Sequence, residues 1–483
     1  MAWQNRTKIV ATLGPASNTA SMIAQLVRAG VDVFRLNCAH ADQETLRRTI
    51  KTIRDVAEEE GCAVGILADL QGPKIRVGKL KGAEPIYLKR GAEVVIDATP
   101  GVIGEAATSG GPIQIGTGYR NLARDVRPKE RILLDDGNLE LRVVNVEGDR
   151  IHTRVVYGGM LHQFKGINLP GSKVSTSCLS SKDLADLAVV LDAGVDFVAL
   201  SFVRSPGDVV QLRGHIQKRK GDALIVAKIE RPEAVACLPE ILAVADVLMV
   251  ARGDMGVEMG PAAVPPVQKR IIAMCNEARK PVITATQMLE SMVLNPRPTR
   301  AEASDVANAI YDGTSAVMLS AETASGRNPV RSVRTMEQII RTAEKSCYTG
   351  MAERMRRRVN GNSSVSVAQA TVRAAAYAAY EAQVRLIAVY TETGTTANLL
   401  AGERPPTHIM AFTPSVRTMQ RLALTWGITA SKIPPKRTSH ELTVAGDRIL
   451  RSEGWVRKGD RIVQIAGTVR ETGLTNTMTI REL

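Results

Sequence analysis

Short apolar runs alternate with amphipathic stretches along most of the 483-residue chain. The first runs cover residues 8–14, 31–37 and 63–70, and amphipathic stretches at 18–30 and 42–60 separate them. Further runs lie at 195–202, 224–230, 247–254, 281–288 and 315–323. Stretches typical of helices lie around them, at about 180–194, 205–220, 232–245, 264–280, 300–312 and 328–346. Because strands that are apolar throughout suit a parallel sheet covered on both faces, these eight units predict an α/β protein built on a (β/α)8 TIM barrel.

The alternation is interrupted once, between residues 75 and 175. Glycines, prolines and short alternating segments dominate there, and strands are predicted at 93–97, 131–134, 139–146 and 150–157. This pattern predicts a small β-barrel domain inserted into a loop at the C-terminal face of the barrel, where it would act as a lid. The barrel would then comprise residues 1–74 and 176–346, and the lid residues 75–175.

A third domain is predicted over residues 347–483. Residues 355–364 are basic and then rich in Asn, Gly and Ser, which indicates a boundary. A helix is predicted at 368–381, a strand at 384–390 and a Thr/Gly loop at 391–396, with further strands at 408–412, 431–433, 461–465 and 477–480. This mixture predicts an α/β domain.

Composition narrows the range of functions. A hydrophobic fraction of 44% is typical of a soluble globular protein, no apolar run has membrane-spanning length, and no signal peptide precedes the first strand. The six cysteines are scattered singly, which favours a reducing cytoplasm over a disulfide framework or a zinc site. The net charge of +14 is compatible with nucleic-acid binding. With aromatics at 3% and no recognised nucleic-acid motif, phosphorylated small molecules are the favoured ligands.

Polar and charged residues end seven consecutive strands of the predicted barrel, from the second to the eighth. In order they are Arg35 and Asn37, Asp69, Ser201, Lys228 and Glu230, Arg252 and Asp254, Thr286, and Ser320 and Glu322. Residues at i and i+2 share one face of a strand, and catalytic groups of TIM barrels lie at the C-terminal strand ends. A structural set of salt bridges is the alternative interpretation, but seven converging ends favour an active site.

The residue types at these ends indicate phosphoryl chemistry. Glu230 and Asp254 supply the hard oxygen ligands that Mg²⁺ or Mn²⁺ prefers. Lys228 is a point charge suited to a phosphoryl group during its transfer, and the planar guanidinium of Arg35 suits phosphate binding through two parallel hydrogen bonds. The Gly-containing turn that begins at Gly253 offers backbone N–H groups to a carboxylate or phosphate.

Several longer motifs identify a family. They are Lys8–Ser17 (KIVATLGPAS), Phe34–Asn37 (FRLN), Gly72–Arg76 (GPKIR), Lys165–Gly171 (KGINLPG), Ala285–Met292 (ATQMLESM) and Pro296–Glu302 (PRPTRAE), together with the Lys-Ile-Glu and Arg-Gly-Asp strand ends. The chain resembles the pyruvate kinases over essentially its whole length. The resemblance implies a barrel, a lid and a C-terminal regulatory domain, and transfer of the phosphoryl group of phosphoenolpyruvate to ADP to give pyruvate and ATP in glycolysis.

The same resemblance implies roles for individual residues. Lys228 would stabilise the moving phosphoryl group, Arg35 would hold the substrate phosphate, and Glu230 and Asp254 would bind Mg²⁺ or Mn²⁺. The pyruvate end would be held by Gly253, Asp254 and Thr286, with Thr286 near the proton delivered to the enolate. The nucleotide would be bound by Asn37, His40, Arg76 and Lys165.

Three departures from the family pattern concern its monovalent cation. The family usually has Ser after Asn-Phe and Thr after the strand-three Asp, whereas this chain has Ala39 and Leu70. Members that require potassium carry Glu in the Gly-Pro-x-Ile-Arg motif, where this chain has Lys74. These coincident changes predict an enzyme that does not require potassium, with the Lys74 ammonium in place of the cation. The alternative is that Lys74 is a solvated loop residue.

The loop that opens a helix of the C-terminal domain resembles the family's effector site. Its residues are Thr391, Thr393, Gly394, Thr395 and Thr396, and a tail loop at 472–477 would close over it. The resemblance implies a sugar phosphate or AMP as effector and a homotetramer.

Two other functions stay open at this point. One is a metal-dependent aldolase or lyase that acts through a pyruvate enolate, which would share the paired carboxylates but would need no phosphate-handling lysine. The other is a basic nucleic-acid-binding protein without catalysis. An assay of ADP-dependent pyruvate formation separates both from a kinase.

Overall fold

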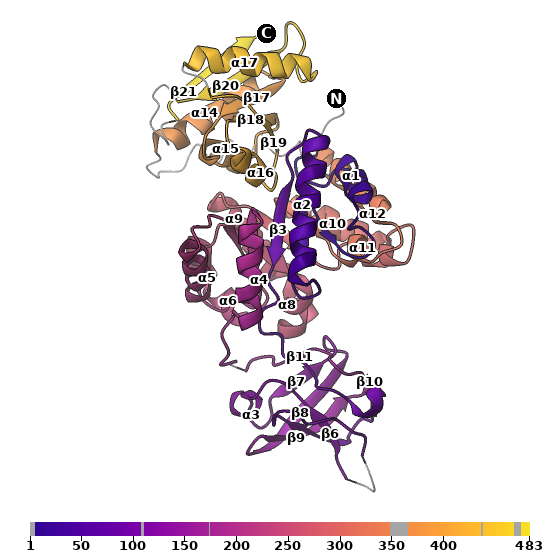
Figure 1. Cartoon of the computed structure of the whole chain (residues 1–483). Coiled ribbons are helices and arrows are strands. Elements are labelled where there is room, and N and C mark those ends of the chain that lie inside the picture. Colours follow the sequence, from indigo (N-terminus) through magenta and orange to yellow (C-terminus); the bar gives the residue numbers. More distant parts are fainter. Residues whose placement is uncertain (1–4, 108–110, 173, 348–365, 436–437, 468–474) are drawn as a thin grey trace.

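Three bodies lie in a row along the molecule, and Figure 1 shows them. The C-terminal domain lies at one end, the barrel in the middle and the inserted lid at the other end. The computed structural model describes residues 5–107, 111–172, 174–347, 366–435, 438–467 and 475–483. The boundary predicted from residues 355–364, and residues 472–474 of the tail loop, lie outside these ranges.

Eight parallel strands close the barrel, in the order β1-β16-β15-β14-β13-β12-β3-β2. The strands are β1 (Lys8–Leu13), β2 (Val33–Asn37), β3 (Gly65–Asp69), β12 (Phe197–Leu200), β13 (Leu224–Ile229), β14 (Val247–Ala251), β15 (Val282–Ala285) and β16 (Ala316–Leu319). They are almost wholly buried, as expected for apolar strands enclosed by helices. The predicted barrel is therefore confirmed.

Helices follow the barrel strands and pack around them. They are α1 (Ala20–Arg28), α2 (Gln43–Glu59), α4 (Ser181–Asp192), α5 (Pro206–Lys218), α6 (Pro232–Ala236), α7 (Leu238–Val244), α8 (Arg252–Met259), α9 (Val264–Glu277), α10 (Arg300–Asp312), α11 (Ala321–Ala324) and α12 (Pro329–Cys347). Capping boxes define several starts, including Ser180 with Asp183 on α4 and Thr299 with Glu302 on α10. Short 3-10 turns lie at Pro261–Ala263 and Glu290–Val293.

The lid emerges between β3 and α4. A six-stranded sheet in the order β11-β7-β8-β9-β5-β6 forms most of it, and β10 and β4 form a two-stranded sheet. Its elements are β4 (Ile86–Leu88), β5 (Glu93–Asp97), β6 (Ile113–Gly116), α3 (Leu122–Asp125), β7 (Arg131–Leu134), β8 (Leu139–Glu147), β9 (Arg150–Tyr157), β10 (Gly159–Leu161) and β11 (Ile167–Asn168), with a 3-10 turn at Lys81–Ala83. Its own apolar core includes Val94, Ile96 and Leu141.

The C-terminal domain is an α/β unit with a five-stranded sheet in the order β19-β18-β17-β20-β21. Its elements are α14 (Val367–Glu381), β17 (Leu386–Tyr390), α15 (Thr395–Gly402), β18 (His408–Thr413), α16 (Val416–Leu422), β19 (Ile428–Lys432), α17 (Ser439–Ser452), β20 (Arg461–Ala466) and β21 (Thr477–Glu482). Ala423 and Leu424, which follow α16, pack with the side chains that fill the barrel interior. The domain therefore lies against the barrel end opposite the lid.

Several predicted strands are too long at their C-terminal ends. The run predicted at 247–254 ends as a strand at Ala251, and Arg252 to Asp254 form the first turn of α8. The runs at 281–288 and 315–323 likewise end at Ala285 and Leu319. The chain must turn outward at the barrel rim to form the next helix, so the polar residues that follow each apolar run leave the sheet. The expectation that Arg252 and Asp254 share a strand face is wrong.

Candidate active site

A buried charge cluster lies at the C-terminal rim of the barrel. Lys228 on β13 places its Nζ 3.1 Å from Glu230 Oε1 and 3.4 Å from Asp69 Oδ1, and it donates a 2.7 Å hydrogen bond to Ser201 Oγ. Arg35 on β2 donates through Nε to Asp69 Oδ2 at 2.7 Å. Strands β2, β3 and β13 and the loop after β12 thus bring these predicted residues together.

Burial and neighbouring charges shift the ionisation of this cluster. Burial alone would raise the pKa of Asp69, but Lys228 and Arg35 outweigh it and hold that pKa below its usual range. Burial would lower the pKa of Lys228, but Asp69 and Glu230 outweigh it and raise that pKa. Burial raises the pKa of Glu230 against the opposing charge of Lys228, and Asp254 raises it further. The lysine is therefore fully charged. Of the carboxylates in the cluster, Glu230 has its negative charge balanced least by neighbouring cations.

The cluster has the chemistry to accept a divalent cation. Its carboxylates are Asp69, Glu230 and Asp254, and its cations are Arg35 and Lys228, so one negative charge is in excess. Glu230 is fully buried, and the Lys228 ammonium 3.1 Å from its Oε1 is the one cation beside it among the described residues. Within the described ranges no three His, Cys, Asp or Glu side chains are grouped to hold a metal by themselves. Mg²⁺ usually takes one or two carboxylates and completes its shell with water and substrate oxygens, so Glu230 and Asp254 fit it.

Thr286 and Gly253 meet beside this cluster. The Gly253 N–H donates to Thr286 Oγ1 at 2.8 Å, and the Thr286 hydroxyl donates to the Ala285 carbonyl at 2.7 Å. A side-chain carbon added at Gly253 would lie in van der Waals contact with Thr286 Oγ1, at 3.4 Å. The first turn of α8 and the end of β15 are therefore fixed to each other through one hydroxyl.

Two predicted strand ends do not join the cluster. Arg252 turns its guanidinium to the carbonyls of residues 285–287 and to Asp305, and it does not share a face with Asp254. Glu322 is fully buried and accepts hydrogen bonds from the Leu289 and Ser320 N–H groups. Glu322 therefore braces the loop after β15 in this structure.

Sequence reasoning missed one member of the cluster. Thr12 at the end of β1 accepts a 3.1 Å hydrogen bond from Arg35 Nη1 and donates to the Leu319 carbonyl. The first strand therefore also ends in a polar group that contacts the site. The signal was present in the sequence, because Thr12 is the one polar residue between Ile9 and Leu13 of an apolar run.

The predicted nucleotide residues lie on both sides of the opening between lid and barrel. Asn37 ends β2 and His40 lies in the loop that follows, where Asn37 Oδ1 accepts from the Ala39 N–H at 3.2 Å. Arg76 and Lys165 lie at the base of the lid, where Arg76 Nη1 donates to the Phe164 carbonyl.

Two aspartates of the lid form ion pairs with lysines near the base of the lid. Lys165 Nζ lies 2.7 Å from Asp135 Oδ1, and Lys74 Nζ lies 3.6 Å from Asp136 Oδ1. Both aspartates have a left-handed backbone, with φ of 53°. In the sequence this Asp-Asp-Gly-Asn stretch is typical of a turn, and that pattern gives its side chains no partner. Lys74 is thus paired with the lid in this structure.

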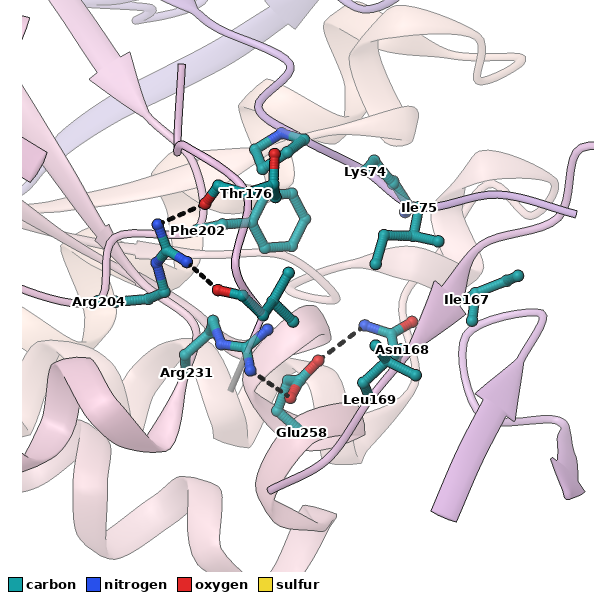
Figure 2. A pocket seen from close by; sticks show the side chains of 12 residues that line it. Lys74, Ile75, Ile167, Asn168, Leu169, Thr176, Phe202, Arg204, Arg231 and Glu258 are labelled. Atoms are coloured by element: carbon teal, nitrogen blue, oxygen red, sulfur yellow. Dashed lines mark hydrogen bonds and ion pairs between the residues drawn. The ribbon is translucent and has the colours of Figure 1, made fainter. Parts of the chain in front are cut away.

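A small pocket lies at the joint of lid and barrel, and Figure 2 shows its lining. Arg204 donates to the carbonyls of Val174 and Thr176, in the segment that returns from the lid. Asn168 of the lid donates to Glu258 of α8 at 3.1 Å, and Arg231 lies on the other side of Glu258 at 3.9 Å. Phe202 in the same lining donates its N–H to Glu230 at 2.7 Å. The joint is therefore connected directly to the charge cluster.

The predicted effector loop opens α15. Gly394 has a φ of 86°, and its N–H donates to Thr391 Oγ1 at 2.9 Å. The hydroxyls of Thr393 and Thr395 lie 2.9 Å apart, and those of Thr396 and Thr475 lie 2.5 Å apart. The loop hydroxyls therefore bond to one another in this structure.

A TIM barrel whose rim combines a buried charged lysine, an arginine and a pair of carboxylates is typical of enzymes that handle phosphorylated anions. Comparison with known proteins makes this class specific. The pyruvate kinase barrel-domain model matches residues 4–333, and the pyruvate kinase alpha/beta-domain model matches residues 369–481. The chain therefore belongs to the pyruvate kinase family and is a phosphotransferase.

Individual relatives agree over nearly the full length. The pyruvate kinase of Corynebacterium glutamicum is 42% identical over 472 residues, which cover 98% of this chain and 96% of the relative. That of Geobacillus stearothermophilus is 43% identical over 485 residues, which cover 99% and 80%. The crystal structure of a Cryptosporidium parvum pyruvate kinase superposes with a TM-score of 0.92 at 33% identity and covers 99% of this chain and 96% of that one. No described helix is long and apolar enough to cross a membrane.

Proposed function

We propose that this enzyme transfers the phosphoryl group of phosphoenolpyruvate to ADP without a potassium ion, because Lys74 supplies the missing positive charge. The observation that carries the proposal is the surroundings of Leu70. Its side chain is buried in the apolar core of the barrel, and its carbonyl already accepts the Ser201 hydroxyl at 2.9 Å. Ala39 offers no side-chain oxygen either, so the side chains at both positions lack the oxygen ligands that a monovalent cation needs.

The position of Lys74 suits this role. It lies in the segment 70–76 that leads from β3 into the lid, with a side chain only partly exposed. A carboxylate, Asp136, holds its ammonium group in this structure. We infer that the ammonium exchanges Asp136 for the phosphate oxygens of the substrates when the lid closes over them.

The residue roles in the proposal follow from the charge cluster. Lys228 and Arg35 hold the phosphate of phosphoenolpyruvate, and the lysine stays on the phosphoryl group as it moves. The bond from phosphorus to the enol oxygen breaks, and a bond from phosphorus to a β-phosphate oxygen of ADP forms. The pyruvate enolate that is released takes up one proton at its methylene carbon, close to Thr286. Lys228, Thr286 and Arg35 are thus the proposed catalytic residues.

Further residues hold the substrates. Gly253, Asp254 and Thr286 hold the pyruvate end, and Asn37, His40, Arg76 and Lys165 hold the nucleotide. Glu230 and Asp254 would hold Mg²⁺ or Mn²⁺, which supplies charge neutralisation and a fixed orientation for the phosphate oxygens. We also propose a cytoplasmic location, which agrees with five free cysteines among the described residues.

Potassium dependence tests the proposal. ADP-dependent pyruvate formation with Mg²⁺ is measured in sodium, tetramethylammonium and potassium buffers of equal ionic strength. The wild type should work equally well in all of them, and Lys74→Glu should lose most of its activity in sodium. Lys79→Glu, at an exposed lysine of the lid five residues further along the chain, serves as the matched control and should behave like the wild type. A large activation of the wild type by potassium would overturn the proposal.

Effector binding and assembly form a second, separate proposal. We propose that the 391–396 loop binds a sugar phosphate or AMP and that the enzyme is a homotetramer, both on the strength of the family resemblance. Phosphate would have to replace the hydrogen bonds among the loop threonines. Titration of activity with sugar phosphates and AMP, in the wild type and in Thr395→Glu, tests the loop. Light scattering tests the assembly.

A further inference from the structure

The turn after β15 is strained at the residue that the proposed function places beside the enolate. Thr286 and Gln287 both have a left-handed backbone, with φ of 69° and 51°. Neither residue is glycine, and Thr286 is branched at its β-carbon, for which this conformation is a true outlier. Such a backbone persists only where its surroundings hold it in place. The question is which groups hold this turn.

Arg252 is the group that holds it. Its guanidinium donates to three consecutive carbonyls, with Nε 3.3 Å from the Ala285 oxygen, Nη2 2.7 Å from the Thr286 oxygen and Nη2 3.1 Å from the Gln287 oxygen. A lysine could not reproduce these contacts, because only the planar fork of arginine presents several donors in fixed directions.

Asp305 fixes the arginine in turn. Its Oδ2 accepts from Arg252 Nη1 at 2.6 Å, and it lies on α10, a thirteen-residue helix capped at both ends. The side chain of Arg252 is only 9% exposed and that of Asp305 is 40% exposed, so solvent reaches this ion pair from the aspartate side alone. The strained turn is thereby connected to a rigid helix on the outside of the barrel.

The same arginine begins α8, and the next residue completes the connection. Gly253 donates its N–H to the hydroxyl of Thr286, while that hydroxyl donates to the Ala285 carbonyl, which Arg252 also contacts. The hydroxyl direction therefore depends on the position of the Ala285 carbonyl and of the helix start, and Arg252 determines both.

We propose that Arg252 and Asp305 are positioning residues that hold Thr286 in its strained conformation and so fix the position of its hydroxyl beside the enolate. This rests on the proposed function, in which Thr286 lies near the proton that the enolate takes up. The contacts of both residues in the described structure include neither Lys228 nor Arg35, the residues proposed to hold the phosphoryl group. Their loss should therefore affect the proton step more than the phosphoryl step.

Two rates measured on the same protein separate these steps. The proton step is followed as exchange of pyruvate methyl protons with D₂O by NMR, with ATP and Mg²⁺ present. The phosphoryl step is followed as ATP formed from phosphoenolpyruvate and ADP in a single turnover. Arg252→Lys should slow the proton exchange about 10- to 100-fold, as expected for a misdirected catalytic group, and slow the phosphoryl step by less than threefold. Asp305→Asn should give the same selectivity with a smaller loss.

A variant that relieves the backbone strain decides whether Arg252 acts by holding the turn. Glycine adopts a left-handed backbone freely, so Gln287→Gly in the Arg252→Lys background should recover most of the lost exchange. Arg213→Lys is the matched control, because Arg213 also bridges a carbonyl (Val244) and an aspartate (Asp246), but on α5, away from the rim. It should leave both rates unchanged.

The outcomes are distinct. Equal loss of both rates in Arg252→Lys, or no recovery in the double variant, overturns the positioning role. If Arg252→Lys does not fold, judged by its thermal unfolding, Asp305→Asn decides alone, since the partly exposed Asp305 tolerates substitution. A wild type that forms no pyruvate from phosphoenolpyruvate and ADP contradicts the proposed function instead, and that result is separate from any effect of the variants.

Discussion

Replacement of Lys228 by methionine should remove both activity and stability, and the structure indicates how much of each. The ammonium lies 3.1 Å from Glu230 and 3.4 Å from Asp69, whose side chains are 0% and 2% exposed. Asp69 keeps Arg35 as a partner, but Glu230 keeps no cation. A buried charge that loses its partner costs about 3–5 kcal/mol, so Lys228→Met should lose about 3 kcal/mol in unfolding free energy without Mg²⁺.

Mg²⁺ should restore part of this stability. The variant site carries two excess negative charges in place of one, so a divalent cation should stabilise the variant more than the wild type. Activity should not return, because the moving phosphoryl group loses its point charge. Cations in this role contribute about 10³-fold or more to kcat. Urea unfolding with EDTA or with Mg²⁺, and ADP-dependent pyruvate formation, measure the two effects.

Ser201→Ala provides the comparison for Lys228→Met. It removes the 2.7 Å hydrogen bond to Lys228 Nζ and the 2.9 Å hydrogen bond to the Leu70 carbonyl but leaves every charge in place, so it should cost only about 1–2 kcal/mol. The reasoning would be refuted if Lys228→Met kept its stability in EDTA, or if its kcat stayed within tenfold of the wild type. The first result would mean that Glu230 is not a buried uncompensated anion in the variant. The second would mean that Lys228 does not neutralise the transferred group.

Two further predictions concern the C-terminal domain and its contact with the barrel. Burial, with smaller effects from nearby cations, lowers the pKa of His408 to about 3, so the neutral ring is the native form. The neutral ring contributes its full stability above pH 6.5, and this stability is lost as the pH falls toward 3, with about 2 kcal/mol lost at pH 5. His408→Gln should flatten this pH dependence of the unfolding free energy. Unfolding is followed by the fluorescence of Trp455, which stacks on His408. Asp196→Ala should cost about 3 kcal/mol by calorimetry, because this fully buried carboxylate pairs with Arg54 and with Arg417 of the C-terminal domain. Asp222→Ala, at an exposed partner of the same Arg417, should cost less than about 1 kcal/mol.

The barrel could be predicted from the sequence because its strands are apolar on both faces. Each of the eight runs contains one strand of the closed sheet. The lid was harder, because its edge strands β4, β6, β10 and β11 have only two to four residues, which are too few for a pattern to be recognised. In the C-terminal domain the run predicted at 431–433 is the end of β19, which begins at Ile428. Short strands depend on their partners more than on their own pattern.

The part of the site that lies at the C-terminal ends of barrel strands could be predicted, because those ends meet at one rim. Lys228, Glu230, Asp69 and Arg35 do lie in contact there, as their spacing predicted. Arg252 was placed wrongly, because residues at i and i+2 share a face only within a strand and Arg252 already lies in the first turn of α8. Residues from distant stretches, such as Asp135 facing Lys165, could not be paired from the sequence, because only the folded lid brings them together.

Strain and uncompensated charge occur at the same rim, and this has a consequence for how the site works. Phe202 has a φ of 56°, and its N–H is held by Glu230, while Thr286 and Gln287 are held by Arg252. A charged side chain thus fixes each of these strained residues: Glu230 belongs to the charge cluster, and Arg252 lies beside it. A ligand that neutralises Glu230 would weaken the hold of that carboxylate on Phe202, which also lines the joint of the lid. The geometry thus links Glu230 through Phe202 to the joint of the lid, whereas it links the turn after β15 through Arg252 and Asp305 to α10.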